Sequence, residues 1–482
     1  MSFRTTASVL GRKFGLLRRS LLQADGLPFA DAISAERIRR AFVEEKVGFG
    51  ADVDAIYTPA VVLWAMLSQS LFTREQRSCV AAVARVAAFY AVLGRRVCGT
   101  NTGAYCRARD KVPAAVARRL AQEVALVCES EVPDSWRWKG RAVRLVDGTT
   151  ISMPDTPRNQ AEYPQPISQA QGVGFPILRA VAVCSLATGM ITAMACGRFA
   201  GKETGETALL RTLFDELAPG DVLLGDRYYG GWFMLALLQE LGLDFVVRLH
   251  QLRKADFEKG RRLGHGDHIV SWPKPAKPPW MDQETYDALP ERLEVREVRV
   301  NVNIPGFRTE SFVVVTSLHD ATEYSREDIS LLYRRRWSVE LHFRDIKTAM
   351  GLDVLRCKTP AAVRRELWTG VLAYNLIRHS ILQSALAAER GPEELSFTAT
   401  MQMLAGTWLT AAVVVGQNPD ATEPLIVLRL THGGSHIVGN RPDRVEPRAV
   451  KRRPKPHALL STPRAEARAK LTTLRSTQLQ AP

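Results

Sequence analysis

The stretch YRRRWSVELHFRDIK, residues 333–347, carries two helical patterns at once. One pattern is polar, with spacings of three, four and seven residues, and its members are Tyr333, Arg336, Glu340 and Lys347. On a helix these side chains fall within an arc of roughly 60°. The other pattern is an adjoining apolar stripe made of Leu332, Val339, Phe343, Ile346 and Met350. We therefore predict one long helix, from Ser325 to Met350, with one stripe buried and a carboxylate beside cations and a phenol on the next.

The polar face of this helix has two interpretations. Charged residues at helical spacing usually form a solvated surface. A lone acid flanked by bases is also what a metal-dependent site for phosphodiester chemistry requires. The spacing alone does not separate the two, so the choice depends on which other acids the fold brings to Glu340.

Two aspartates on strand-like segments precede the helix. Residues 142–146 alternate toward Asp147, so we predict a strand that ends at this aspartate, and the apolar run 221–225 leads into Asp226. A carboxylate just beyond a strand projects at the edge of the sheet, where open α/β sites usually form. Hard cations such as Mg²⁺ bind carboxylate oxygens, and two ions roughly 4 Å apart can promote phosphodiester cleavage. With Glu340, the aspartates make a candidate two-metal site.

The remaining chain predicts a mixed α/β protein. Residues 1–135 are helical in character, and from residue 141 the order is three strands, helix, strand, helix, strand. Residues 250–308 break this order, and we interpret them as an inserted β-rich subdomain. The predicted strands are 142–146, 177–186, 190–196, 221–225, 244–249 and 311–318, and the predicted helices are 206–217, 232–241, 325–350 and 361–385. Glu203 and Glu206 are assigned to the start of the helix at 206–217.

Charge and length bound the class of protein. The 482 residues exceed the usual size of one domain, so we expect two to four domains. The net charge of +15 predicts a polyanionic partner, with nucleic acid ahead of a membrane surface. Residues 441–482 contain eleven Lys or Arg and three acids, a net charge of +8. We interpret this tail, which includes KRRPKP at 451–456, as a flexible basic arm or a solubilising segment.

Cysteine usage and hydropathy indicate the compartment. Seven cysteines without a CxxC pair argue against a disulfide framework and a structural zinc site, so a reducing cytoplasm is expected. The first 20 residues lack the apolar core of a secretory signal. Residues 395–419 carry no charge, but four threonines, a serine and two glutamines make a membrane span a poor interpretation. A buried helix or a self-association surface is favoured there, and no membrane partner is expected.

The aspartates and the helix together resemble a known family. The pattern Asp147-Gly-Thr, then Asp226-Arg-Tyr-Tyr, then Tyr-x2-Arg-x3-Glu-x6-Lys from residue 333 is similar to the DDE transposases of bacterial insertion sequences. Within them it resembles the group with the Tyr-Arg-Glu-Lys signature, the insertion-sequence-four type. Further stretches are similar, GVGFP at 172–176 and LRCKT at 355–359. The resemblance spans about residues 140–390, roughly half of the chain.

The resemblance implies roles for the candidate residues. Asp147, Asp226 and Glu340 would be the catalytic carboxylates and the ligands of two Mg²⁺ ions, with Mn²⁺ able to substitute. The DNA-binding residues would be Tyr333, Arg336 and Lys347, which hold phosphates near the scissile end, and a tryptophan of the insertion, Trp272 or Trp280. Such a tryptophan would stack on a base displaced from the duplex end, because every base offers a π-face; a position in the core is the alternative for both.

The resemblance also implies a fold class and a domain order. We expect an α/β protein with an RNase H-like catalytic core interrupted by a β-rich insertion, a helical N-terminal domain and a helical, basic C-terminal region. The predicted segments are a DNA-binding domain at 1–135, the catalytic core at 140–250 and 309–388, the insertion at 251–308, and the C-terminal region with its basic tail at 389–482.

The activity implied is cut-and-paste DNA transposition. The protein would bind the inverted-repeat ends of its own element as double-stranded DNA, pair two ends in a homodimeric synaptic complex, cleave by hydrolysis, and join the freed 3′-hydroxyl to target DNA. A hairpin on the element's end is the implied route to the second cut, and a bacterial cytoplasmic, nucleoid-associated location is expected. The alternatives are a catalytically silent DNA-binding regulator derived from such an enzyme, and a stand-alone nuclease on the same fold.

Overall fold

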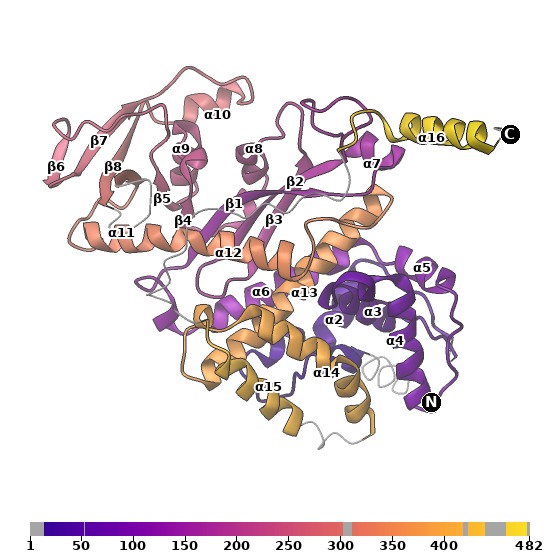
Figure 1. Ribbon diagram of the computed structural model, residues 1–482. Coiled ribbons are helices and arrows are strands. Elements are labelled where there is room, and N and C mark those ends of the chain that lie inside the picture. The colour runs from indigo at the N-terminus through magenta and orange to yellow at the C-terminus, as the bar shows by residue number, and fades with distance from the viewer. Residues whose placement is uncertain (1–13, 53, 302–310, 418–422, 439–458, 480–482) are drawn as a thin grey trace.

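A nine-stranded mixed sheet forms the centre of the protein, with strand order β3-β2-β1-β4-β5-β9-β8-β7-β6 (Figure 1). The computed structural model describes residues 14–52, 54–301, 311–417, 423–438 and 459–479. Helices lie on both faces of the sheet, and a largely helical N-terminal part lies beside its β1–β3 side. This is the mixed α/β architecture that the order of strands and helices predicts.

One half of the sheet contains the segments that lead to the two aspartates. β1, β2 and β3 form an antiparallel meander, while β4 runs parallel to β1 and β5 runs parallel to β4. The turn between β2 and β3 includes Gly189, whose φ of +69° is a conformation that L side chains rarely adopt. The strands are β1 (Val143–Ser152), β2 (Ile177–Ser185), β3 (Ile191–Arg198), β4 (Val222–Gly225) and β5 (Asp244–Arg248).

The other half of the sheet comes mainly from the segment predicted as an inserted subdomain. Its strands do not form a sheet of their own, because β8 pairs with β9 and β9 pairs with β5, so all four are hydrogen-bonded into the central sheet. A single sheet satisfies the backbone groups that β5 would otherwise expose at an edge. The elements are β6 (Arg261–Gly264), β7 (Asp267–Pro273), α10 (Gln283–Ala288), β8 (Arg292–Asn301) and β9 (Ser311–Thr316).

The two faces of the sheet pack against different helices. Alternate residues of a strand point to opposite faces, and Leu145 and Leu224 pack with the helices that include α13 and α6, which we name the α13 face. Val146 and Leu223 pack on the opposite side against α8 and α9, which we name the α9 face. The helices are α6 (Ala114–Glu131) and α13 (Pro360–Ala387) on the first face, and α8 (Glu206–Arg211) and α9 (Trp232–Glu240) on the second.

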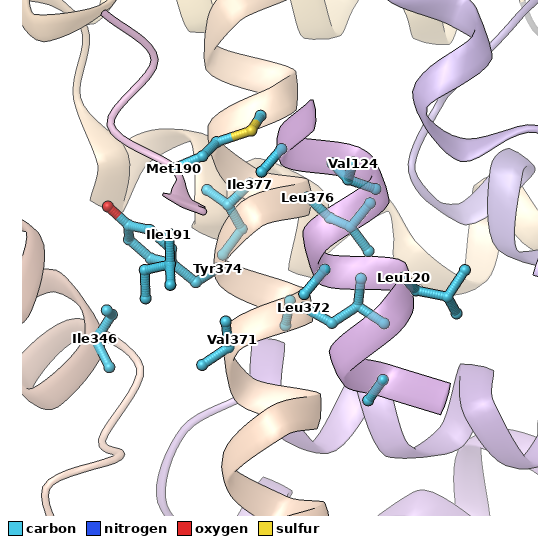
Figure 2. Close-up of a cluster of buried hydrophobic side chains, with 14 of the residues drawn as sticks. Leu120, Val124, Met190, Ile191, Ile346, Val371, Leu372, Tyr374, Leu376 and Ile377 are labelled. Carbon is cyan, nitrogen blue, oxygen red and sulfur yellow. The ribbon is translucent and has the colours of Figure 1, made fainter. Parts of the chain in front are cut away.

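The packing of α13 on α6 forms the centre of the larger core (Figure 2). Figure 2 shows Leu372, Leu376 and Ile377 of α13 beside Leu120 and Val124 of α6. Among these apolar side chains lies the buried amide of Asn375 on α13. It accepts from the Ile191 backbone N–H at 3.0 Å and donates to the carbonyls of Ile191 and Ala121, both at 2.9 Å. One side chain thereby ties β3, α6 and α13 together.

The N-terminal helices are not separated from the sheet by a gap in packing. The buried side chains of α2 to α6 belong to the same hydrophobic core as the α13 face, so the predicted division near residue 135 does not coincide with the edge of a core. Residues 14–20 are helical as well. The other N-terminal helices are α2 (Ala35–Glu44), α3 (Pro59–Leu71), α4 (Cys79–Val92) and α5 (Gly103–Asp110).

Within the uncharged segment at 395–419, the described residues form a helix with one side in the core, as one of the two favoured interpretations predicts. α14 (Phe397–Gln417) places Trp408 in the core, where its ring stacks on Trp64 of α3 with 5.7 Å between ring centroids. Within the described ranges, no helix is long and apolar enough to cross a membrane. α15 (Glu423–Ser435) follows and packs on α13 and α14.

The basic C-terminal tail is partly helical. α16 (Arg464–Leu479) extends away from the body of the protein, at the yellow end of the chain in Figure 1. The Arg, Ala, Lys and Leu residues of α16 have good helix propensity, and the flexibility of the basic arm stays a prediction. The basic run at 451–456 lies outside the described residues.

The core predicts a clear contrast between two leucines. Leu372 of α13 is 2 % exposed, whereas Leu126 of α6 is 70 % exposed. We expect Leu372→Ala to lower the free energy of unfolding by about 2–5 kcal/mol, because it removes buried methyl groups and leaves a cavity. The matched control Leu126→Ala should change it by less than about 0.5 kcal/mol. Urea unfolding followed by circular dichroism measures both, and equal effects would contradict the assignment of the core.

Candidate active site

The parallel register of β1 and β4 brings the two aspartates to one position. Leu145 pairs with Leu224, and the pairing stops there. Asp147 and Asp226 each lie two residues after these paired leucines. Both aspartates therefore follow, at the alternate position, a residue that points to the α13 face. Asp226 comes directly after β4 ends at Gly225, and its carboxylate Oδ1 accepts the Tyr228 N–H at 2.7 Å.

The alternating pattern predicts that β1 ends at Asp147, and this prediction is wrong. β1 continues to Ser152 because β2 pairs with it along this whole length, from Asp147 opposite Ala182 to Ser152 opposite Ile177. Only the neighbour on the other side, β4, is short. Asp147 is therefore held rigidly within a strand and still borders the open position where β4 has stopped, so it is free on that side.

The predicted long helix has three kinds of turn. Ser325 begins it with a capping box closed by Asp328, and the chain then passes through α11 (Arg326–Arg334), a 3₁₀ turn (Arg335–Trp337), α12 (Ser338–Arg344) and a π-helical turn (Asp345–Ala349). The apolar stripe is confirmed, because all five of its members are buried. The tight and wide turns change the angular positions of the polar residues, and π turns inside helices are frequent at functional sites.

The four polar residues of this helical segment have different partners. Arg336 Nη2 donates to Glu340 Oε1 at 2.9 Å, and Lys347 Nζ donates to Oγ1 of Thr149 on β1 at 2.9 Å. Tyr333 is buried with its ring 5.1 Å from that of Phe312 on β9. The charged face is thus docked against the sheet beside Asp147, which excludes a fully solvated surface for Arg336 and Lys347.

Burial and like charges make the site electrostatically strained. Burial, together with the nearby Asp226 and Glu206 carboxylates, raises the pKa of Asp147 to about 6, against the lowering effects of the Gly148 N–H and Arg336. Burial raises the pKa of Tyr333 to about 12, so its phenol stays protonated at neutral pH. Burial opposes the charge of Arg336, but Tyr333 and Glu340 outweigh it and raise its pKa.

The carboxylates suit a hard divalent cation, although they are not gathered around one point. Within the described part of the chain, no group of three or more His, Cys, Asp or Glu is arranged to hold a metal ion. Glu340 instead pairs with Arg336, and its side chain is 43 % exposed. The donors are all carboxylate oxygens, which Mg²⁺ and Mn²⁺ prefer, and a bound cation would favour the charged form of Asp147, whose pKa is raised mainly by burial.

The two tryptophans of the insertion occupy different environments. Trp272 on β7 is 6 % exposed, its indole N–H donates to Glu297 Oε1 at 3.1 Å, and Arg253 covers its ring at 3.9 Å. It lies in the core and offers no face to a base in this arrangement. Trp280 is 36 % exposed, and the Arg211 guanidinium lies 3.7 Å from its ring centroid. Of the two candidates, only Trp280 keeps exposed ring surface.

One acid at the site was not anticipated as functional. Glu206 does begin α8, as predicted, but its carboxyl group lies directly over Gly148 and interacts electrostatically with Asp226. The only sequence signal for a further group at this position was Gly148, the glycine after Asp147, which leaves space for a side chain from another element. Sequence spacing gave no reason to connect Glu206 with a position 58 residues earlier.

Comparisons with known proteins identify the family. Residues 138–376 match the family described as the transposase DDE domain. The transposase InsG of insertion sequence element IS4 from Escherichia coli K12 is 28 % identical over 357 residues, which cover 73 % of this chain and 76 % of that protein. The putative transposase InsL of element IS186A, also from Escherichia coli K12, is 38 % identical over 74 residues, 15 % of this chain and 20 % of that protein.

A cryo-EM structure of the piggyBac transposase synaptic complex with hairpin DNA aligns with a TM-score of 0.44 and 10 % identity, covering 89 % of this chain and 87 % of that one. The family match spans the two aspartates, the signature helix and most of α13. The chain therefore belongs to the DDE transposases, of the type found in the bacterial insertion sequence IS4. It is a cut-and-paste transposase, an enzyme of DNA strand cleavage and strand transfer.

The raised pKa of Asp147 predicts a stability that falls as pH rises in metal-free protein. An aspartate with a folded pKa of about 6 and an unfolded pKa of about 3.9 destabilises the fold once pH exceeds the lower value, and the loss is complete above the higher one. We expect Asp147→Asn to be more stable than wild type by about 1–2 kcal/mol at pH 7, with the difference vanishing below about pH 4.

Chemical unfolding with chelator present at several pH values measures this difference. Asp134→Asn is the control, because the side chain of Asp134 is 98 % exposed, and it should change stability little at any pH. A wild type that matches Asp147→Asn at pH 7 would contradict the electrostatic strain assigned to the site.

Proposed function

We propose that the catalytic core of this transposase is RNase H-like and that Asp147, Asp226 and Glu340 hold two Mg²⁺ ions, with Mn²⁺ as a substitute. The order β3-β2-β1-β4-β5, with an antiparallel meander followed by two parallel strands, supports the fold. The observation that carries the site is the β1–β4 register, which puts Asp147 and Asp226 side by side, with Glu340 docked on the same face from α12.

The bound ions supply charge neutralisation at the scissile phosphate and activation of an attacking oxygen. The residues of the chain hold the carboxylates in place. Asp147 is fixed within β1, and Asp226 is fixed by the Tyr228 N–H. Arg336, whose charge also acts on Asp147, pairs with the Glu340 carboxylate at 2.9 Å, so the third acid has a cationic partner.

Phosphate binding is the role proposed for the remaining signature residues. Arg336 offers a planar fork and Lys347 a point charge, so the two differ in the phosphate geometry they accept. The protonated phenol of Tyr333 is suited to donate to an oxygen of the DNA backbone. Their placement between the sheet and the helix lets them contact a DNA strand that lies across the two aspartates.

A basic cavity beside Asp226 supports a DNA partner. Its volume is about 330 Å³, and its charged lining consists of Arg227, Arg248, Arg253, Lys254 and Arg299. Arg227 directly follows the catalytic aspartate, and Phe312 of the lining contacts Tyr333. Such a concentration of cations next to a carboxylate centre favours a polyanion whose backbone continues past the point of cleavage.

We further propose that the DNA substrates are the inverted-repeat ends of the element and the target duplex. Two ends must be cut together for the element to move as a unit, which favours a homodimer in a synaptic complex. A hairpin on the element's end is the proposed route for cutting the second strand. A nucleoid-associated cytoplasmic location follows from this substrate.

A cleavage assay on labelled DNA that carries the flanks of this gene tests the proposal. We expect Mg²⁺-dependent cutting at a fixed end, and Glu340→Gln and Asp226→Ala should lower the rate by about 10³-fold or more while binding of the end persists. Glu327→Gln, on the exposed side of α11, is the control. Loss of end binding as severe as the loss of cleavage would argue against the carboxylates as metal ligands.

The same assay separates the alternative functions. Binding without cutting would indicate a regulator derived from a transposase, and cutting at random positions would indicate a general nuclease. The presence of all three carboxylates favours a catalytic role over a purely regulatory one, and the Tyr-Arg-Lys set favours the handling of a defined DNA end over general nuclease activity.

Arg336 has a separate prediction. We expect Arg336→Ala to weaken or misplace the complex with the DNA end, since both a phosphate contact and the partner of Glu340 are lost. Arg344→Ala, at a neighbouring side chain that is 64 % exposed, should leave binding and cleavage near wild type. Gel-shift and cleavage assays on the same labelled end measure both variants, and unchanged cleavage in Arg336→Ala would remove this arginine from the site.

A further inference from the structure

Glu206 approaches the catalytic aspartates from the α9 face of the sheet, opposite to Glu340. A β-carbon placed on Gly148 would lie only 2.1 Å from the Glu206 Cδ atom and 2.4 Å from its Oε1. A side chain at position 148 could not coexist with this carboxyl group. The glycine that follows Asp147 in β1 is therefore the opening through which Glu206 reaches the edge of the sheet where both aspartates stand.

The carboxyl group of Glu206 is held in this place by a second contact. The phenol of Tyr229 donates to Glu206 Oε2 at 3.4 Å, and Tyr229 is itself fully buried on the 3₁₀ turn Arg227–Tyr229, which Asp226 caps. The same short segment thus carries one catalytic aspartate and the group that positions Glu206. Because Tyr229 lies only three residues after Asp226, its contact with Glu206 links the positions of the two acids.

The alternative for Glu206 is a purely local role at the start of α8. Its neighbour Glu203 shows what such a role looks like, since its side chain is 57 % exposed and pairs with Arg211 at 2.5 Å. Glu206 forms no comparable ion pair with any described residue, and it is half-buried beside two like charges, Asp147 and Asp226. The three carboxylates are partly buried, and the charges that offset them are those of Arg179 near Glu206 and Arg336 near Asp147. A divalent cation between the carboxylates would add to this stabilisation.

We propose that Glu206 is a fourth carboxylate of the cleavage centre and helps to bind the divalent cation held by Asp147 and Asp226. Glu206 on α8 would then contribute a carboxylate from the α9 face of the sheet and Glu340 on α12 one from the α13 face. Gly148 and Tyr229 are positioning residues that act through Glu206. This inference rests on the proposed function, because it requires that the two aspartates bind a cation.

The test is direct binding of Mn²⁺ to the full-length chain, measured by electron paramagnetic resonance of the free ion. We expect Glu206→Gln, which keeps the shape of the side chain, to weaken Mn²⁺ binding by about 10- to 100-fold. Glu203→Gln is the matched control and should bind as wild type does. Asp226→Asn is the reference for loss of the site. Thermal unfolding of the metal-free proteins confirms that each variant is folded.

The outcomes separate this inference from the proposed function. If Asp226→Asn loses Mn²⁺ while Glu206→Gln binds like Glu203→Gln, Glu206 is overturned as a ligand and the proposed function stands. If Asp226→Asn binds Mn²⁺ as wild type does, the metal assignment behind both fails. Should Glu206→Gln not fold, Tyr229→Phe decides: it removes the donor to Glu206 and should weaken Mn²⁺ binding about 2- to 5-fold, whereas wild-type affinity would overturn the inference.

Discussion

The parallel pairing of Leu145 with Leu224 is the constraint on which the rest of the site depends. It sets β1 and β4 in a register that carries Asp147 and Asp226 to the same level, and a shift of one residue would send one aspartate to the opposite face. β4 then stops while β1 continues against β2, which opens one side of Asp147 without loosening its backbone. A rigid strand next to an open position is what a catalytic carboxylate needs.

The helices complete what the register begins. α13 and α6 cover the α13 face of the sheet through a dry core and the buried Asn375, and α12 packs on the same face, where Arg336 pairs with Glu340 and interacts electrostatically with Asp147. The excess of negative charge at the centre is surrounded by cations, including those of the cavity next to Asp226. That pattern suits a centre that binds divalent cations and a DNA backbone together.

Much of this was predictable because it depends on local pattern. The apolar stripe from Leu332 to Met350 is buried as its spacing predicts, and α13, α14 and the strands leading to both aspartates lie close to their predicted positions. The predicted end of β1 was wrong because a distant partner decides it: β1 runs past Asp147 because β2 pairs with it. The predicted insertion is β-rich, but its pairing with the main sheet, in which β9 links β8 to β5, was not foreseen.

The sequence by itself determined the chemistry of this protein: two aspartates after apolar strands, and a Tyr-Arg-Glu-Lys helix whose residue types and order resemble those of the DDE transposases. Only the tertiary structure decided which groups meet. It placed Trp272 in the core, paired Arg336 with Glu340, and brought Glu206 over Gly148. The physical reason is that strand register and helix packing join residues far apart in the chain, while spacing along the sequence describes only neighbours within one element.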